Sequence, residues 1–302
     1  MNSSSQSLRI LILGANGMLG HMLFEVLSSV RDWHVVGTVR SSKAKKMLQS
    51  ILPAYADKVI AGVDVTDLTA LEDALDLAKP DVVINCVGLI KQDQSANDPI
   101  AAITLNALLP HRLEHWCAKH AVRLIHISTD CVFSGQKGAY TEEDICDAQD
   151  WYGKSKYLGE LSSPNSMTLR TSIIGPELPS QASHGLLAWF MAQTGSCPGY
   201  SRAVFSGLPT VILAEILRDV VIPNTKLNGL YQVSAQPITK LDLLQMVANT
   251  FNMDIAIVPT TNPILDRSLN GARFEKATGY HTPDWPELIS RMHTHWTCYV
   301  QK

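Results

Sequence analysis

The segment Leu8-Arg-Ile-Leu-Ile-Leu-Gly14-Ala-Asn-Gly17-Met-Leu-Gly20 decides the fold. It begins with a short apolar run, which is followed by glycines at positions 14, 17 and 20. Residues 18–28 have the periodicity of a helix. A strand that passes through a glycine-rich turn into a helix is the start of a dinucleotide-binding unit. One glycine makes the tight turn, one lets a pyrophosphate approach the backbone, and one lets helix and strand pack closely. Backbone N–H groups and the helix dipole would then hold the phosphates.

The same alternation of strand and helix recurs along the first half of the chain. Strands that are apolar throughout and alternate with helices predict a parallel sheet covered on both faces. Connections between parallel strands are right-handed almost without exception, so we expect an α/β fold with a doubly wound, Rossmann-like sheet. The further strands are expected at residues 33–39, 59–63, 81–87 and 122–127, with helices at residues 68–77 and 100–120.

The pattern changes after about Ser172. A stretch rich in Gly, Ser and Pro runs to about Pro209 and is predicted to be irregular. We therefore expect an NADP-binding, Rossmann-like domain over residues 1–172 and a smaller substrate-binding lobe over residues 173–302, with some late elements packing back on the sheet. Later helices are expected at residues 211–221 and 239–250, with a strand at residues 229–234.

The composition is that of a globular protein in a reducing compartment. A chain of 302 residues can bury a large core, and a net charge of -3 gives no bulk attraction to nucleic acid or to an anionic membrane. The six cysteines are scattered without a CxxC pair, which favours buried thiols over disulfides or metal ligands. The polar start lacks the features of a signal peptide. We expect a cytoplasmic protein with no metal site and no membrane or nucleic-acid partner.

The end of the second strand bears on the choice of cofactor. A 2′-hydroxyl group is usually held by an acidic residue at this place, and here the chain has none. Arg40 and Ser41 instead offer the cation and the hydroxyl that a 2′-phosphate would need, although Arg40 could also be a solvated charge. The sequence therefore favours NADP(H), with NAD(H) possible. Residues expected along the rest of the cofactor are Asp64 and Val65 near the adenine, and Asn85, Cys86 and Gly88 beside the nicotinamide.

Two motifs carry the candidate catalytic residues. Thr129 ends the fifth strand, at the carboxyl edge where open α/β sheets bind their ligands. Tyr152 and Lys156 are four residues apart, so in a helix they point the same way. An ammonium beside a phenol favours the phenolate, and we expect Lys156 to lower the pKa of Tyr152 towards neutrality. Such a tyrosine can protonate a carbonyl oxygen as a hydride arrives, while Thr129 holds the same oxygen.

Four motifs together resemble the extended short-chain dehydrogenase/reductases, and among these dTDP-4-dehydrorhamnose reductase and its sugar-nucleotide relatives. The resemblance runs from about Leu8 to Asn270. It implies that Thr129, Tyr152 and Lys156 form a catalytic triad, with Lys156 also holding the nicotinamide ribose. The motifs are the glycine loop, Ser128-Thr-Asp-Cys-Val-Phe-Ser-Gly135, Tyr152-Gly-Lys-Ser-Lys156 and Leu169-Arg-Thr-Ser-Ile-Ile-Gly175.

The resemblance also implies an NAD(P)-dependent oxidoreductase with a nucleotide-sugar substrate, and a homodimer is among the assemblies it allows. The cofactor-binding residues expected are Gly14, Asn16, Gly17, Met18, Leu19, Gly20, Arg40, Ser41, Asp64, Val65, Asn85, Cys86, Gly88, Asn106, Ser128, Tyr152, Lys156 and Ile174. The substrate-binding residues expected are Lys91, Asp130, Arg170, Arg202 and Arg267. Of these, Arg202 and Arg267 could hold a diphosphate or could be surface charges.

One departure leaves the substrate open. Lys91 and Gln92 stand where the rhamnose-pathway reductases carry a Tyr-Thr-x-Val-Asp-like segment, so the sugar and its nucleotide (dTDP or UDP) are undetermined. We expect NADPH-dependent reduction of a keto group on a nucleotide-activated deoxysugar, for surface polysaccharide precursors. An epimerase or dehydratase is an alternative, weakly disfavoured because Cys131 rather than a second acid follows Asp130. Another is a non-catalytic, cofactor-binding subunit resembling the β subunit of methionine adenosyltransferase.

Overall fold

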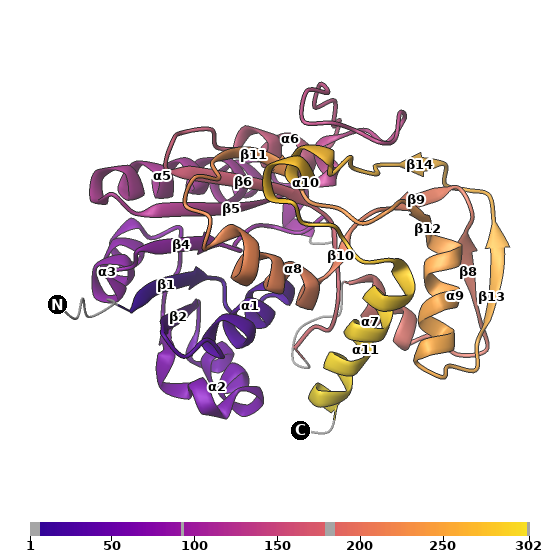
Figure 1. Ribbon diagram of the computed structural model, residues 1–302, viewed down its shortest axis with the longest axis horizontal. Helices are drawn as coiled ribbons and strands as arrows, with labels where there is room; N and C mark the ends of the chain where they lie inside the picture. Colours follow the sequence, from indigo (N-terminus) through magenta and orange to yellow (C-terminus); the bar gives the residue numbers. More distant parts are fainter. Residues whose placement is uncertain (1–6, 92–93, 179–184, 301–302) are drawn as a thin grey trace.

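The computed structural model describes residues 7–91, 94–178 and 185–300. Within these ranges, seven strands form one sheet in which every neighbouring pair is parallel. They are β1 (Leu8–Leu13), β2 (Trp33–Val39), β3 (Val59–Ala61), β4 (Val82–Asn85), β5 (Arg123–Thr129), β6 (Ser166–Thr171) and β11 (Gly229–Gln232). Their order is β11-β6-β5-β4-β1-β2-β3, which confirms the predicted doubly wound, Rossmann-like α/β fold (Figure 1).

Helices connect these strands and cover both faces of the sheet (Figure 1). The helices are α1 (Met18–Ser28), α2 (Ser42–Ile51), α3 (Leu68–Ala78), α4 (Pro99–Ala102), α5 (Leu109–His120), α6 (Trp151–Leu158), α7 (Leu186–Met191), α8 (Thr210–Ile216), α9 (Lys240–Thr250), α10 (Ala272–Thr278) and α11 (Trp285–Val300). Shorter or irregular turns are η1 (Pro53–Lys58), η2 (Gln94–Asn97), η3 (Ile103–Leu108), η4 (Asp130–Val132) and η5 (Leu217–Val221).

The alternation of side chains along β1 explains why the strand is apolar throughout. Ile10 and Ile12 point into a core shared with α1 and α8, whereas Leu11 and Leu13 point into a second core shared with α3 and α5. All four side chains are buried, at 1% exposure or less. Successive residues of a strand face opposite sides of the sheet, so both faces must be covered by helices for this pattern to be stable.

The predicted helix over residues 100–120 is helical throughout but not one regular α-helix. Between α4 and α5 the chain makes a π-helical turn, η3. Such turns are often found at functional sites. This one carries Asn106, which is buried.

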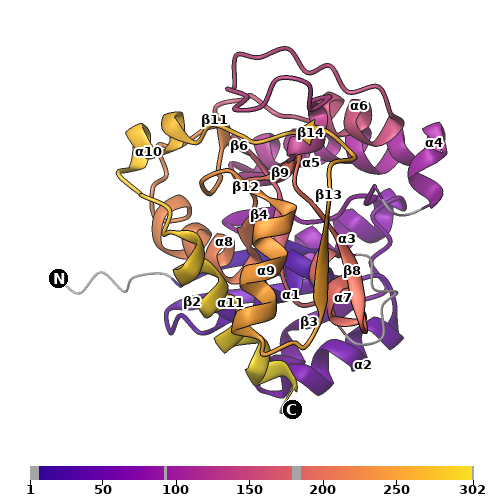
Figure 2. The same ribbon diagram turned by 90° about the vertical axis from the view of Figure 1, so that its right-hand side faces the viewer.

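The second half of the chain both completes the sheet and builds a lobe beside it (Figure 2). β11 pairs with β6, and α8 packs against the core face that holds α1. The stretch up to Pro209 that was predicted to be irregular contains α7 and several strands, so that prediction was wrong for its described part. The lobe's strands form three small sheets: β7 (Ile173–Ile174) with β10 (Leu208–Pro209), β8 (Ser196–Tyr200) with β13 (Ala256–Thr260), and β9 (Ala203–Phe205) with β12 (Ile238–Thr239) and β14 (Leu265–Asp266).

Two negative observations concern the part of the chain that the structure describes. None of its helices combines the length and apolar character that a membrane crossing requires. It also contains no group of three or more His, Cys, Asp or Glu side chains arranged to hold a metal ion.

Candidate active site

The three glycines where β1 leads into α1 have different structural roles, and Gly20 lies in the first turn of α1. Gly14 adopts a φ of +78°, a left-handed conformation that favours glycine at the turn. A Cβ atom on Gly20 would lie 2.1 Å from the carbonyl oxygen of Gly14, so helix and strand approach too closely for any side chain. A Cβ atom on Gly17 would meet only that same oxygen, at 3.4 Å. The space beside Gly17 is therefore open, and the loop fits a dinucleotide pyrophosphate at the start of α1.

The end of β2 presents Arg40 at the surface, followed by Ser41 as the N-cap of α2. The hydroxyl oxygen of Ser41 accepts a hydrogen bond from the Ala44 amide at 3.2 Å. Hydrogen bonds from Thr66 hold the pKa of Asp64 below its ordinary value, and the nearby Arg40 guanidinium contributes in the same direction. Arg40 directly follows β2 and Asp64 follows the neighbouring strand β3, so both lie at the carboxyl edge where the adenosine end of the cofactor was predicted.

The side chain of Asn85 makes its hydrogen bonds in the interior of the protein. It is buried, and its Nδ2 lies 3.1 Å from Nδ1 of His126 on the neighbouring strand β5. Its Oδ1 accepts a hydrogen bond from the Val87 amide at 3.1 Å. Burial raises the pKa of the next residue, Cys86, to about 12, so its thiol stays protonated. These contacts fix the chain end from which Gly88 enters the cleft.

Gly88 lies between the nucleotide loop and the predicted catalytic residues. A Cβ atom placed there would be 3.0 Å from Oδ1 of Asn106 and 3.8 Å from Nζ of Lys156. One residue earlier, Val87 would contact a Cβ atom on Gly14, at 3.0 Å. A continuous path therefore leads from the glycine loop to Lys156, as a dinucleotide lying across the carboxyl edge would need.

Thr129, Tyr152 and Lys156 all lie at this edge. Thr129 ends β5, and α6 carries the other two residues on one face. Asp150 caps α6 by accepting a hydrogen bond from the Gly153 amide at 2.7 Å. The ammonium of Lys156 donates to the Ile127 carbonyl at 2.7 Å, and burial lowers its pKa to about 8.

The prediction that Lys156 lowers the pKa of Tyr152 is wrong for this structure. Burial raises the pKa of the phenol, the charges of Cys131, Asp130 and Asp150 add to the rise, and a hydrogen bond with Thr129 opposes it. Spacing alone could not show this, because desolvation disfavours the charged phenolate and here outweighs other effects. Tyr152 is consequently held in its protonated form.

Asn106 joins two parts of the site from the π-helical turn. Its Oδ1 accepts a hydrogen bond from the Leu89 amide at 2.9 Å, and its Nδ2 donates to Oγ of Ser155 at 3.1 Å. The loop after β4 and helix α6 are thereby held together on either side of Lys156. Asn106 thus fixes the position of Leu89 relative to Ser155.

The structure does not place Arg170 where it could bind a substrate, contrary to the prediction. Only 2% of Arg170 is exposed, and its guanidinium donates to both carboxylate oxygens of Glu160, at 2.8 and 2.7 Å. It also lies over the Phe133 ring, 5.2 Å from the centroid. The hydroxyl of Ser128 likewise donates to Glu160, at 2.7 Å. Arg170 and Ser128 therefore both bind the carboxylate of Glu160, in a buried network.

The other predicted substrate residues differ in their surroundings. Nζ of Lys91 donates to Asp150 at 2.6 Å, next to the start of α6. Burial raises the pKa of Asp130, which directly follows Thr129, and Arg267 opposes the rise. Nε of Arg267 donates to the Phe133 carbonyl at 2.7 Å. Arg202 is exposed, immediately before β9, and Gln92 lies outside the described residues.

Most of the remaining predicted cofactor residues are buried. Val65, Leu19 and Ile174 are buried in the protein core. Met18 lies at the start of α1, where its terminal carbon would be 2.4 Å from a Cβ atom on Gly185. Asn16 is half-buried in the glycine turn.

Sequence reasoning missed Lys240. This half-buried residue begins α9, and its charge acts on Asp130. A signal for it exists only in the tertiary pairing of β12 with β9, because nothing near Lys240 in the sequence marks a site.

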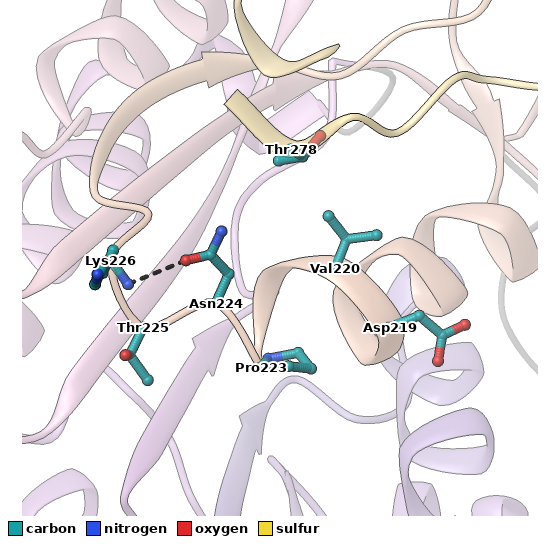
Figure 3. A pocket seen from close by; sticks show the side chains of 7 residues that line it. All are labelled: Asp219, Val220, Pro223, Asn224, Thr225, Lys226 and Thr278. Carbon is teal, nitrogen blue, oxygen red and sulfur yellow. Dashed lines mark hydrogen bonds between the residues drawn. The ribbon is translucent and has the colours of Figure 1, made fainter. Parts of the chain in front are cut away.

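Two cavities lie away from the catalytic residues. One, of about 530 Å³, opens beside the end of η5 and is lined by Asp219, Val220, Pro223, Asn224, Thr225, Lys226 and Thr278 (Figure 3). The other, of about 490 Å³, lies past the end of β11, between residues 232–237 and 269–282. Neither contains Thr129, Tyr152 or Lys156.

Comparison with known proteins gives the family. Residues 8–297 match the model of the RmlD substrate binding domain. The chain belongs to the RmlD substrate binding domain family. This membership confirms the resemblance seen in the motifs, and the match extends past Asn270 to nearly the end of the chain.

Two kinds of relative occur in the comparison. The dTDP-4-dehydrorhamnose reductase of Aggregatibacter actinomycetemcomitans is 26% identical over 313 residues, covering 94% of this chain and 98% of that protein. The methionine adenosyltransferase 2 subunit beta of Rattus norvegicus is 32% identical over 281 residues, covering 89% of this chain and 79% of that protein. The chain is thus similar both to a dTDP-4-dehydrorhamnose reductase and to a subunit of methionine adenosyltransferase.

A solved structure supports the fold. The dTDP-4-dehydrorhamnose reductase of Bacillus anthracis, in complex with NADP, superposes with a TM-score of 0.77 at 18% identity. The match covers 96% of this chain and 99% of that one. This chain therefore shares its fold with a reductase that was solved with NADP.

Proposed function

We propose that this chain reduces a keto group on a nucleotide-activated deoxysugar, with NADPH as the cofactor. The observation that supports it most is that Thr129, Tyr152 and Lys156 lie together at the carboxyl edge of the sheet. Nζ of Lys156 would lie 3.8 Å from a Cβ atom on Gly88, the residue that follows the contact between Val87 and the glycine loop. A site with a dinucleotide cradle and a protonated phenol beside it is suited to add a hydride and a proton to a carbonyl group.

The residues present fit the cofactor. Gly17 leaves room for the pyrophosphate, and Arg40 lies where a 2′-phosphate would extend from the adenosine. Lys156, beside Gly88, would hold the nicotinamide ribose. When bound, NADPH supplies the hydride.

The protein's own residues supply the proton. Burial keeps Tyr152 protonated, so its hydroxyl can donate to the substrate carbonyl oxygen as negative charge develops there. The hydroxyl of Thr129, which hydrogen-bonds with Tyr152, would hold the same oxygen. Lys156 has a pKa of about 8 and is mostly cationic at neutral pH, so it would offer a charged donor to the nicotinamide ribose.

The test is a panel of dTDP- and UDP-4-keto sugars, with NADPH consumption followed by absorbance. We expect stoichiometric oxidation of NADPH with at least one of them. The Tyr152→Phe protein, prepared in the same way, is the control for a contaminating reductase. Conversion of a sugar without net NADPH consumption would favour an epimerase or dehydratase instead. A parent protein that turns over no member of the panel would contradict the proposal.

A second candidate function rests on the 32% identity to methionine adenosyltransferase 2 subunit beta. On this view the chain binds the cofactor and a catalytic partner chain and does not turn over a sugar. Pull-down with a methionine adenosyltransferase catalytic chain, with and without NADP⁺, distinguishes the two. A stable complex together with inactivity on the sugar panel would favour this function.

A further inference from the structure

The turn that ends helix α6 carries an acidic residue that the proposed reaction does not use. Glu160 lies two residues past Leu158, the last residue of α6, and its amide donates to the Tyr157 carbonyl at 3.1 Å. Gly159, between Leu158 and Glu160, has no room for a Cβ atom because the Asn106 carbonyl lies against it. These two contacts fix the backbone that presents Glu160.

Side chains from two neighbouring strands bind the carboxylate of Glu160. Ser128 of β5 and Arg170 of β6 are register partners in the sheet, so their side chains leave the same face. The Ser128 hydroxyl donates to Oε1 at 2.7 Å, and the Arg170 guanidinium donates to Oε1 at 2.8 Å and to Oε2 at 2.7 Å. Only 8% of the Glu160 side chain and 3% of the Arg170 side chain are exposed. One buried carboxylate thus ties the end of α6 to the ends of β5 and β6.

Lys156 makes a second contact between α6 and β5. Its ammonium donates to the Ile127 carbonyl at 2.7 Å, one residue before the Ser128 hydroxyl that binds Glu160. The two contacts join α6 and the turn that ends it to consecutive residues of one strand, and Thr129 is the residue that follows them. The distance between Thr129 on the sheet and the candidate residues on α6 therefore depends on this docking.

We propose that Glu160 is a positioning residue, whose carboxylate holds α6, with Tyr152 and Lys156, at the distance from Thr129 that the reaction needs. The tie is strong because it is buried and its acceptor is charged. Small displacements matter in such a site, since a shift of about 1 Å in a catalytic group can lower the rate about a hundredfold. The inference rests on the proposed function, because it assumes that Thr129 and Tyr152 act on the same carbonyl oxygen.

The charge of Glu160 gives this role a signature that a purely structural contact lacks. Burial lowers the pKa of Lys156 to about 8, and the Glu160 carboxylate opposes that lowering. Two other titratable groups lie near enough to interact with Lys156, the Cys86 thiol and the His126 imidazole. Both are neutral at pH 7, because burial raises the pKa of Cys86 to about 12 and lowers that of His126 well below its ordinary range. Removal of the Glu160 charge should therefore lower the pKa of Lys156.

The first measurement is steady-state kinetics of Ser128→Ala, which removes one hydrogen bond to the carboxylate and leaves the Arg170 ion pair. We expect kcat to fall about ten- to a hundredfold, while the NADPH affinity stays unchanged. In a Thr129→Val background the same change should cost much less, because the hydroxyl that Glu160 positions is already absent. Unchanged kcat in Ser128→Ala, or losses that simply multiply in the double variant, would overturn the inference.

Ser166→Ala is the matched control. Ser166 is also buried and donates to a carboxylate oxygen of Glu114 at 2.8 Å, but it begins β6, at the opposite edge of the sheet from Thr129. The two alanine variants lose the same kind of hydrogen bond, so their stability to urea should fall by similar amounts. We expect kcat to fall in Ser128→Ala and to stay unchanged in the control. An equal loss of kcat in both would reflect general destabilisation and would overturn the inference.

The second measurement is an NMR titration of lysine labelled with ¹³C at Cε, in the protein without cofactor, with the Lys156 signal assigned from Lys156→Met. The parent midpoint should lie at about pH 8. Glu160→Gln combined with Arg170→Met removes both charges, so no buried charge is left alone, and should lower that midpoint. Loss of the Arg170 charge acts in the opposite direction, so a fall is due to Glu160. An unchanged or raised midpoint would contradict the inference.

This inference and the proposed function fail in different ways. Turnover of a keto sugar with an unchanged kcat in Ser128→Ala contradicts only the inference. A parent protein that turns over no member of the panel contradicts the reductase proposal, and the NMR titration then decides the inference by itself. A lowered midpoint supports the place of Glu160 beside Lys156, and an unchanged midpoint removes it.

Discussion

The carboxyl edge of the large sheet and the small sheet β12-β9-β14 are in contact through Arg267 and the segment that follows Thr129, but they are built differently. At the large sheet, the candidate residues sit in short motifs, and local geometry brings each motif together: Tyr152 and Lys156 share one helix face, and Gly14 and Gly20 share one turn. At the small sheet, Lys240 and Arg267 are neighbours only because two strands pair with β9. Candidate residues of the large sheet are thus brought together by local sequence motifs. Those of the small sheet are brought together only by strand pairing.

The largest effect is expected at the centre of the local region. Tyr152→Phe removes one oxygen, the proposed proton donor, and should lower kcat about a hundred- to ten-thousandfold. NADPH should still bind, because the glycine loop and Lys156 are unchanged in this variant. Steady-state kinetics beside NADPH titration checks both. Full turnover in this variant would remove Tyr152 from the mechanism.

A comparison of Gly17 with Gly20 tests whether each glycine has a separate role in the nucleotide loop. Gly20→Ala places a Cβ atom 2.1 Å from a backbone oxygen that cannot move freely, and should lower the free energy of unfolding by about 1–3 kcal/mol. Gly17→Ala meets nothing closer than 3.4 Å, so it should fold normally while weakening NADPH binding. Urea unfolding and cofactor titration of both proteins test the pair. Equal loss of stability in the two would show that the glycines are not specialised.

A pH titration examines the charge of Lys156. With a pKa of about 8, the residue is protonated below that pH and neutral above it. NADPH affinity of the parent should therefore fall as pH rises through about 8, and converge on that of Lys156→Met, whose affinity should not change there. Tyr152 cannot produce this change, because burial moves its pKa upward. A parent affinity that is flat from pH 7 to about 9 would argue against a cofactor contact at Lys156.

The smallest effect is expected at Arg40, the exposed residue that follows β2. Arg40→Asp should reduce the preference for NADPH over NADH about five- to tenfold, since a solvated charge contributes less than a buried one. NADH affinity should hardly change. Titration with both cofactors measures the ratio. A parent that binds the two equally well would end the NADP assignment.

The part of the fold with strong periodicity could be predicted from the sequence. The bounds of β1, α1 and β2 agree with the predicted residues, because their apolar patterns end at glycine or polar residues. In contrast, β8 contains Pro198 and Gly199, and its partner β13 contains Pro259. Local propensity opposes a strand at all three positions, so only the pairing of the two segments reveals it.

The site shows the same division. The spacing of Tyr152 and Lys156 correctly predicts that one helix face carries them, but it holds no information about desolvation, which sets the pKa of the phenol. Arg170 lies in a family motif, yet its ion pair with Glu160 follows from burial on β6 rather than from the motif. Lys240 has no local signal at all.

The pairing of β11 with β6 has a consequence for how the protein is made. β6 is complete at Thr171, but the strand that covers its outer edge is not synthesised until residues 229–232. A nascent chain that has emerged from the ribosome only as far as β6 therefore presents an open strand edge, a feature that promotes association with other chains. Slowing translation between residues 172 and 229 should lengthen that exposure and increase the demand for chaperones.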